Sequence, residues 1–354
     1  MNFLKGLLMP FAAIYDGVTA FRNTSFDKGW KKSVHFDVPV ISVGNLTVGG
    51  TGKTPHIEYL IRLLKDQYRT GVLSRGYGRK TTGYILADEQ ATARSIGDEP
   101  MQFYAKFGTD VMVAVGEERA LAIPQMLHED ESIKAILLDD AYQHRKVKRD
   151  LDILLTDYGR LFYQDFVLPA GRLRESRKGA LRADIVIVSK CPDNLAAKER
   201  AVISQNIKRY TRADVPVLFT GIRYGKLQKL NESAPEVNSK NIVLVTGIAH
   251  SMRLKEDLRG RGYNIIEHLE FGDHYSYNRY SIKRIQDAYT QFSNRNAFIL
   301  TTEKDAVKLM QDVHKESLKD IPVYYQPIEV YFLEGEEILS KKVMETVAAA
   351  EVEK

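Results

Sequence analysis

The chain has 354 residues, which are too many for one typical domain and suit two. Its hydrophobic content of 44% and charged content of 27% lie in the ordinary range of globular proteins. A formal charge of +5 permits an anionic ligand or surface but does not require nucleic acid, and we expect no nucleic-acid partner. The single cysteine, Cys191, excludes an intramolecular disulfide and is consistent with a reducing compartment.

The first 22 residues predict an amphipathic helix. Apolar side chains recur there at helical spacing, at Phe3, Leu4, Leu7, Leu8, Phe11, Ile14, Tyr15, Val18 and Phe21. Lys5, Pro10 and Asp16 make the segment too polar for a transmembrane span, and it lacks the small-residue cleavage site of a signal peptide. We therefore expect a helix that lies in a membrane interface. The alternative is a helix packed against its own domain.

A glycine-rich turn follows the first predicted strand, within residues 40–55. An apolar run leads into a turn that ends in Gly-Lys-Thr, and a helix-compatible segment follows. This is the layout of a phosphate-binding loop, although Thr47 stands where the motif usually has its first glycine. An ordinary strand-to-helix turn is the alternative. The residues predicted to bind nucleotide are Thr47, Val48, Gly49, Gly50, Thr51, Gly52, Lys53, which reaches the β- and γ-phosphates, and Thr54, which holds Mg²⁺.

Strands and helices then alternate to about residue 215. Strands are expected at 70–74, 110–115, 134–138, 151–156 and 183–189, and helices at 56–66, 98–107 and 117–128. The strands are largely unbroken apolar runs, which is typical of a parallel sheet covered by helices on both faces. Ligands bind such sheets beyond the carboxyl ends of the strands, where the glycine-rich turn, Arg75, Asp139 and Asp140 all lie.

A second α/β unit is predicted over residues 225–322. The extended segments 216–224 and 323–332 are expected to pair as a two-stranded connector between the two units. The predicted organisation in chain order is a membrane-interface helix (1–22), a P-loop domain (23–215), the connector strands (216–224 and 323–332) around the smaller α/β domain (225–322), and a closing helix (333–354).

Several acidic residues could serve phosphoryl transfer. Asp139 and Asp140 end an apolar strand, as in a Walker B strand that delivers a carboxylate to Mg²⁺, although one of them could only cap a turn. Asp98 is a candidate base and Glu99 a candidate metal ligand, with capping of the helix that they begin as the alternative. His274, in a Gly-Asp-His loop of the second unit, could share a proton with a carboxylate or be structural.

Two basic loops, at 144–149 and 169–178, suit phosphate recognition because guanidinium groups bind phosphate through paired hydrogen bonds. They indicate an anionic acceptor or an anionic lipid surface, or else a solvated basic face. Residues 189–193 read Ser-Lys-Cys-Pro-Asp, which departs from the guanine-reading Asn-Lys-x-Asp and favours adenine.

These pieces together resemble one family, the tetraacyldisaccharide 4′-kinases of lipid A biosynthesis, along nearly the whole chain. The segments that carry the resemblance are SVGNLTVGGTGKTP (42–55), LSRGYGR (73–79), GDEP (97–100), LDDAYQHR (138–145), LPAGRLRE (168–175), FGDH (271–274) and TEKDAVK (302–308). The loop of this family also lacks the first glycine of the motif, so Thr47 agrees with the resemblance. Arg172 departs from it, because other members carry proline there, but Arg174 and Glu175 stay in register.

The resemblance implies two α/β/α sandwich domains, joined by a two-stranded connector, that close over MgATP. It implies transfer of the γ-phosphoryl group to the 4′-hydroxyl of a tetraacyldisaccharide 1-phosphate at the cytoplasmic face of the inner membrane, with the N-terminal helix docked on the bilayer. The implied catalytic residues are Asp98, His274, Lys53 and Arg174. The implied metal ligands are Thr54, Glu99, Asp139 and Asp140. The residues implied to face the acceptor are Arg75, Tyr77, Gln143, Arg174 and Glu175.

Two alternatives belong to other classes. A nucleotide-dependent switch or metal-delivery NTPase could share the variant loop, but it predicts a Cys/His cluster or a guanine motif. A soluble kinase for a small sugar predicts no membrane affinity for residues 1–22. We therefore favour the ATP-dependent lipid kinase.

Overall fold

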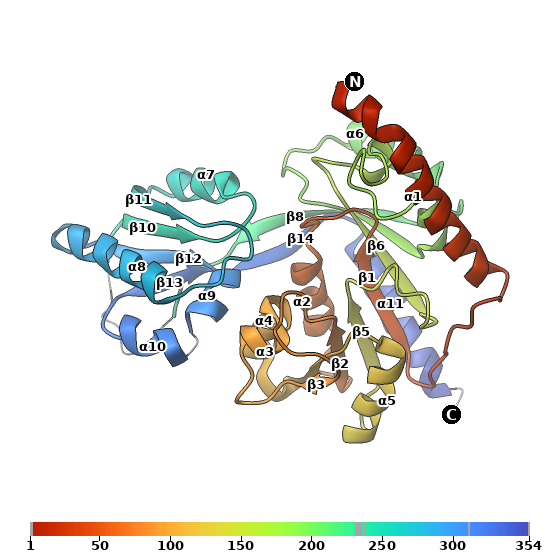
Figure 1. Ribbon diagram of the computed structural model, residues 1–354, viewed down its shortest axis with the longest axis horizontal. Coiled ribbons are helices and arrows are strands. Elements are labelled where there is room, and N and C mark those ends of the chain that lie inside the picture. Colours follow the sequence, from red (N-terminus) through yellow and green to blue (C-terminus); the bar gives the residue numbers. More distant parts are fainter. Residues whose placement is uncertain (1–2, 231–235, 237, 311, 353–354) are drawn as a thin grey trace.

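Two β-sheets organise the protein (Figure 1). The computed structural model describes residues 3–230, 236, 238–310 and 312–352. A nine-stranded sheet with its helices forms the large lobe, and a five-stranded sheet with its helices forms the small lobe. The predicted class, α/β with a parallel sheet of the P-loop type in the larger part, is confirmed.

The described strands of the large lobe are parallel except at its two edges, where β14 and β3 run antiparallel to their neighbours. In spatial order they are β14 (Ile328–Glu334), β8 (Val217–Tyr224), β7 (Ile185–Ser189), β6 (Leu151–Asp157), β1 (Val40–Asn45), β5 (Ala135–Asp139), β2 (Thr70–Ser74), β4 (Val111–Val115) and β3 (Ile85–Leu86). The central strands are buried on both faces, which is why their sequences are apolar without alternation.

Helices cover both faces of the large sheet. One face packs against α2 (Lys53–Leu64), α4 (Asp98–Phe107) with the short α3 (Ala93–Ile96) before it, and α11 (Glu336–Val352). The other face packs against α5 (Arg119–Glu129) and α6 (Ala197–Lys208). Because Leu339 and Val343 of α11 join the core that Ile57 and Leu60 of α2 enter, the closing helix returns to the large lobe.

The small lobe repeats the three-layer plan around a shorter sheet. Its strands in spatial order are β11 (Asn264–Glu270), β10 (Asn241–Thr246), β12 (Phe298–Thr302), β13 (Val323–Gln326) and β9 (Gln228–Lys229). Its helices are α7 (Met252–Gly260), α8 (Arg279–Phe292), α9 (Glu303–Leu309) and α10 (Asp312–Leu318). The core on one side of the sheet includes α7, and the core on the other includes α8 and the last residues of α9 and α10.

The lobes are joined by an antiparallel ribbon of β8 and β14, in which Ile328 pairs with Tyr224 and Phe332 with Thr220. The prediction that all of 323–332 belongs to this connector is wrong for its first part, because β13 pairs with β12 of the small sheet. Pro327 separates β13 from β14, and its carbonyl oxygen accepts the N–H of Gly225 at 3.0 Å. Proline lacks the N–H that a continuous ladder would use, so one extended segment is divided between two sheets.

The N-terminal helix α1 (Phe3–Asp27) lies along the outside of the large lobe (Figure 1). It continues through Pro10 and extends past the predicted end at residue 22. Its apolar stripe faces away from the lobe, with exposures of 61–67% at Leu7, Phe11, Ile14, Val18 and Phe21. These side chains therefore do not pack against their own domain. No helix of the described chain is long and apolar enough to cross a bilayer.

Candidate active site

The glycine-rich turn connects β1 to α2 at the carboxyl edge of the large sheet. Gly52 precedes the helix with φ 83° and Gly49 has φ 110°, conformations that residues with a Cβ rarely adopt. A Cβ added to Gly49 or Gly50 would meet no described atom within 4 Å, so the turn borders open space. A phosphate bound there would meet backbone N–H groups and the positive end of the α2 dipole.

Neighbouring segments hold this turn in shape. The Asn45 amide, at the end of β1, donates to the Thr51 hydroxyl at 2.8 Å. Ser189, at the end of β7, donates to the Thr51 carbonyl oxygen at 2.8 Å. On the other side, the Val48 N–H donates to the Arg172 carbonyl oxygen at 2.8 Å. Hydrogen bonds within the protein therefore hold the loop in this open shape.

His56, in α2, links the loop to the ribbon between the lobes. Its Nδ1 donates to the Gly52 carbonyl oxygen at 2.7 Å, and its Nε2 accepts the Thr220 hydroxyl of β8 at 3.1 Å. Burial lowers the pKa of His56 to about 4, so the folded protein holds this imidazole neutral.

Acid is therefore expected to destabilise the fold through His56. The unfolded chain protonates this group near its ordinary pKa of 6.5, whereas the folded state resists protonation down to about pH 4. The stabilisation is complete above pH 6.5 and is lost as the pH falls toward 4, a change of about 3 kcal/mol. In His56→Gln, urea unfolding from pH 7 down to pH 4 should lose correspondingly less free energy of unfolding. If His56→Gln lost as much free energy of unfolding between pH 7 and pH 4 as the wild type, or as the exposed-site control His128→Gln, this role would be contradicted.

Three charged side chains converge beside the loop. Lys53 Nζ lies 3.6 Å from Asp140 Oδ1, and the Arg174 guanidinium donates to the two oxygens of the same carboxylate at 2.8 and 3.0 Å. Burial opposes ionisation of Asp140, but Lys53 and Arg174 outweigh it and lower the pKa of this carboxyl. Asp140 therefore keeps two cations next to the loop, where a triphosphate needs charge compensation.

Asp139, the neighbouring carboxylate, is buried. Ser74 donates to its Oδ2 at 3.0 Å, while its Oδ1 is buried without a hydrogen-bond partner among the described residues. Burial and the charge of Glu99 raise the pKa of Asp139 to about 7. A buried carboxylate oxygen without a partner among the described residues is suited to coordinate a cation.

The residues present suit Mg²⁺ bound together with a nucleotide rather than a metal held by protein alone. In the part of the chain that the structure describes, no group of three or more His, Cys, Asp or Glu side chains is arranged to hold a metal. Mg²⁺ in phosphoryl-transfer sites usually has one or two carboxylate ligands and completes its octahedron with substrate phosphates and water. Asp139 and the hydroxyl of Thr54, at the start of α2, are compatible with that arrangement.

The two lobes meet at Asp98 and His274. Asp98 begins α4 of the large lobe, and His274 follows β11 of the small lobe, with its Nδ1 3.4 Å from Asp98 Oδ2. Lys308 of α9 approaches the same oxygen at 3.7 Å. The Tyr77 ring packs edge-on against the imidazole, with ring centroids 5.6 Å apart. The structure thus brings together two residues from separate units of the sequence, a pairing across the cleft that the family resemblance implied.

A second polar contact between the lobes lies beside the connecting ribbon. Lys106 of α4 bridges Glu58 of α2, at 2.6 Å, and Glu303 of α9, at 2.7 Å. Both carboxylates are buried, and Glu303 also accepts the N–H of Ile328 in β14 at 3.4 Å. This contact holds α9, the helix that carries Lys308, against the large lobe.

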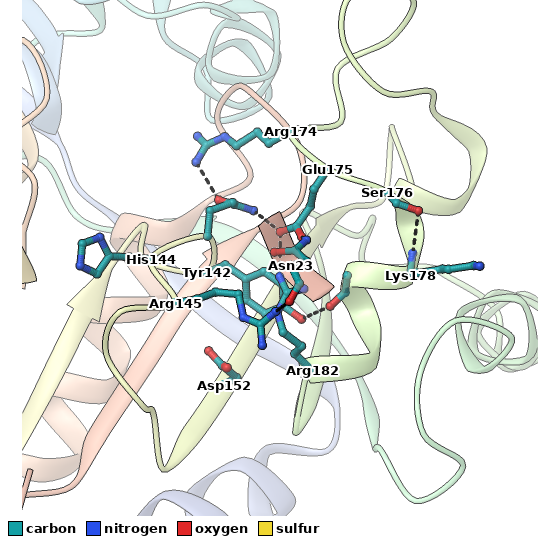
Figure 2. Close-up of polar contacts among 12 residues, drawn as sticks. Asn23, Tyr142, His144, Arg145, Asp152, Arg174, Glu175, Ser176, Lys178 and Arg182 are labelled. Atoms are coloured by element: carbon teal, nitrogen blue, oxygen red, sulfur yellow. Dashed lines mark hydrogen bonds and ion pairs between the residues drawn. The ribbon is translucent and has the colours of Figure 1, made fainter. Parts of the chain in front are cut away.

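Glu175 is placed differently from the prediction that it faces the acceptor. Glu175 is 2% exposed, and its carboxylate accepts hydrogen bonds from Asn23 of α1 at 2.5 Å, Gln143 at 3.0 Å and Arg182 at 2.7 Å (Figure 2). Both oxygens are therefore engaged by the protein itself. Glu175 joins the N-terminal helix to the loops of the site, and its geometry does not support direct contact with a substrate.

The helix α1 also contacts the backbone of these loops. The Tyr15 hydroxyl donates to the Arg174 carbonyl oxygen at 3.0 Å, and Arg22 donates to the Gln143 carbonyl oxygen at 2.9 Å. The Gln143 side chain in turn donates to the Asn45 carbonyl oxygen, at the end of β1, at 2.9 Å. The N-terminal helix is thus connected to the phosphate loop through Gln143.

The other predicted residues lie around this centre. Arg75 and Tyr77 follow β2 and are exposed, and Glu99 is close enough to Asp139 to raise its pKa. Sequence reasoning missed Arg119, a buried group whose Nη2 lies 3.5 Å from the Asp139 carbonyl oxygen. It also missed Lys304 and Lys308, for which the 302–308 segment was the available signal.

Comparison with known proteins agrees with this geometry. The family described as tetraacyldisaccharide-1-P 4′-kinase matches residues 4–348. The tetraacyldisaccharide 4′-kinase of Flavobacterium johnsoniae is 45% identical over 352 residues, which cover 98% of each chain. That of Bacteroides thetaiotaomicron is 45% identical over 345 residues, covering 93% of this chain and 90% of the relative.

A solved structure resembles the fold over its whole length. The crystal structure of LpxK from Aquifex aeolicus in complex with ATP is 31% identical in sequence and has a TM-score of 0.75. The similarity covers 98% of this chain and 100% of the Aquifex chain. From its loop, its paired lobes and these relatives, the chain belongs to the tetraacyldisaccharide 4′-kinase family.

Proposed function

We propose that this protein is an ATP-dependent kinase that transfers the γ-phosphoryl group of MgATP to the 4′-hydroxyl of a tetraacyldisaccharide 1-phosphate in lipid A biosynthesis. One arrangement supports the proposal most strongly. The phosphate loop, with Lys53 beside it, lies in the lobe that also carries Asp98, and the small lobe brings His274 to Asp98. Because Glu99 influences the pKa of Asp139, the start of α4 lies close to the phosphate site.

In the proposed reaction, Asp98 accepts the proton of the 4′-hydroxyl as that oxygen attacks the γ-phosphorus in line with the leaving oxygen. Lys53 and Arg174 stabilise the negative charge of the transferring group. Mg²⁺, held by Thr54 and by Asp139, Asp140 or Glu99, would neutralise charge on the β- and γ-phosphate oxygens. His274 orients Asp98 from the small lobe.

The acceptor is proposed to approach from the side of the exposed residues Arg75 and Tyr77, since Tyr77 contacts His274. Arg174 donates to Asp140 and lies 3.4 Å from Gln143 Oε1, and these two residues are proposed to hold acceptor or transferring phosphate once their present partners are displaced. Such paired donors suit phosphate oxygens.

The N-terminal helix is proposed to dock the protein on the cytoplasmic face of the inner membrane, where ATP is available and the lipid acceptor lies. The outward stripe of α1 is the apolar face of such a helix. Trp30, which is 63% exposed, follows the helix, and Lys28 stacks over its ring. Indole rings and lysines suit the headgroup region of an anionic bilayer.

Weakening this face should release the protein from membranes. Phe11→Ser combined with Ile14→Ser removes two side chains that are 61% and 67% exposed, so the fold should lose little stability. We expect sedimentation with anionic phospholipid vesicles to fall by about tenfold. The matched control is Leu121→Ser, which removes an apolar side chain that is 66% exposed on α5. Unchanged sedimentation of the double variant would exclude α1 as the docking face.

The function itself is tested by incubating the purified protein with γ-labelled ATP and the disaccharide 1-phosphate lipid. We expect label in a doubly phosphorylated lipid. Release of labelled phosphate without a lipid product would favour a nucleotide-dependent switch. Phosphorylation of a small sugar in place of the lipid would favour a soluble sugar kinase.

A further inference from the structure

The imidazole of His274 is held on three sides by groups from both lobes. Its Nδ1 lies 3.4 Å from Asp98 Oδ2, and its Nε2 lies 2.9 Å from the Nζ of Lys304 in α9. The Tyr77 ring covers it edge-on. His274 itself has φ 55°, a left-handed conformation in which few non-glycine residues are found, so the loop places this ring at a backbone cost of its own.

The chemistry of these partners determines where the ring carries its proton. A lysine ammonium has three donors and no acceptor, so Nε2 must be the acceptor of the Lys304 hydrogen bond. A ring whose Nε2 accepts has its proton on Nδ1, the nitrogen that faces the Asp98 carboxylate. The proton-bearing Nδ1 of the neutral imidazole therefore faces Asp98 Oδ2 at 3.4 Å, which is longer than an ordinary hydrogen bond, and Asp98 Oδ1 is left to accept another proton.

We propose that Lys304 is a positioning residue that fixes the Nδ1–H tautomer and the ring orientation of His274. The inference rests on the proposed function only in that the Asp98–His274 pair serves phosphoryl transfer. Without the ammonium, no group of the protein would require Nε2 to accept, and the tautomer with its proton on Nε2 would turn a lone pair toward the Asp98 carboxylate. Lys304 acts through His274 and needs no contact with substrate.

A buried network fixes the segment from which Lys304 reaches the ring. Thr302 caps α9 by accepting the Asp305 N–H at 3.2 Å, and its hydroxyl donates to Asp305 Oδ2 at 2.7 Å. Asp305 also accepts the N–H of Gly247 at 2.8 Å and pairs with Lys308 at 2.9 Å. Asp305 is fully buried.

The same segment supplies both cations that face the pair. Lys304 meets the imidazole, and Lys308, which is nearly buried, meets Asp98 Oδ2. Both belong to the small lobe, as does His274. The small lobe thus itself supplies the cation that sets the tautomer of the histidine it presents to Asp98.

The test compares Lys304→Met and Lys304→Gln with Lys304→Arg in the full-length protein. Lys304 is half-buried, so both variants should fold. If Lys304→Met does not fold, Lys304→Gln, which keeps a polar group at this position, serves in its place. We expect kcat to fall by about tenfold or more in Met and Gln, with KM for ATP changed by less than about twofold, and to recover partly in Arg. Lys283→Met, which removes an exposed lysine of α8, should change neither.

Two further measurements separate positioning from a general effect of charge. Long-range ¹H–¹⁵N spectra report which ring nitrogen carries the proton, and loss of a signal in His274→Ala assigns this residue among the eight histidines. We expect wild type to show the Nδ1–H form and Lys304→Met to lose it. In a double-mutant cycle, Lys304→Met should add no loss of kcat to His274→Ala.

Three results would overturn the inference: unchanged kcat in Lys304→Met, an unchanged His274 spectrum, or a full additional loss of kcat in the double variant. The last would mean that Lys304 acts on phosphate or substrate directly. The spectra need no lipid acceptor, so this inference and the proposed function can fail separately.

Discussion

Replacing Asp98 by alanine is expected to lower kcat for lipid phosphorylation by about 10²- to 10⁴-fold, the usual contribution of a positioned general base. The carboxylate is contacted by His274 at 3.4 Å and by Lys308 at 3.7 Å from the other lobe, so truncation removes both the base and the contact that assembles it. KM for ATP should change little, because the phosphate loop and Lys53 do not contact Asp98. Steady-state kinetics with labelled ATP and varied lipid measure both constants.

Asp98→Asn separates the base from its packing. The amide keeps the shape of the side chain but accepts no proton, so its kcat should fall nearly as far as that of Asp98→Ala. Asp66→Ala, which removes a carboxylate that is 79% exposed beyond α2, is the matched control and should retain wild-type turnover. A kcat for Asp98→Asn close to that of the wild type would remove Asp98 from the role of base.

Local sequence pattern was sufficient to predict those features that depend on the residues of a single element. An apolar run such as residues 135–139 can be satisfied only by burial on both faces, so the strand and the position of Asp139 at its carboxyl end follow together. The glycine-rich turn could be predicted equally well, because glycine is the residue that tolerates the positive φ values which the structure has at Gly49 and Gly52. These signals predicted which residues gather at the carboxyl edge of the large sheet.

Pairing between segments that are far apart in the chain could not be predicted from local sequence pattern. Residues 323–326 and 328–334 are both extended, and nothing in their side chains states which sheet each joins. The division depends on pairing partners far away in the chain, β12 for one segment and β8 for the other. The approach of Lys304 to His274 likewise depends on distant pairing, because the strands that precede them, β12 and β11, both pair with β10. The motif at 302–308 was therefore visible while its role was not.

A motif also does not say whether its members face a ligand or the interior. Arg174 and Glu175 are neighbours in one segment, yet Arg174 binds Asp140 beside the phosphate loop whereas Glu175 is buried against α1. Consecutive residues of an irregular loop point in different directions. Only their partners determine which residue faces the interior, and for Glu175 these partners include Asn23 and Arg182.

Replacing Lys53 by alanine is expected to lower kcat/KM for ATP by about 10²- to 10³-fold, the effect of removing one donor aimed at developing charge. Lys53 Nζ lies 3.6 Å from Asp140 Oδ1 and the lysine side chain is 10% exposed, so the carboxylate holds the ammonium beside the loop. Once nucleotide is bound, the cation is expected to turn from Asp140 to the β- and γ-phosphates. Both nucleotide affinity and turnover should therefore suffer, in contrast to Asp98→Ala.

The comparison between Lys53→Ala and Lys53→Arg tests whether charge alone is enough. Arginine keeps the charge, but its wider planar head group cannot take the position of the ammonium between Asp140 and the loop, so it should restore less than about a tenth of the lost activity. Lys341→Ala, at a lysine that is 75% exposed on α11, is the matched control and should behave as wild type. Thermal unfolding should show all three variants folded. Wild-type KM and kcat in Lys53→Ala would mean that the glycine-rich turn does not bind the triphosphate. The assignment of this turn as the nucleotide site would then be wrong.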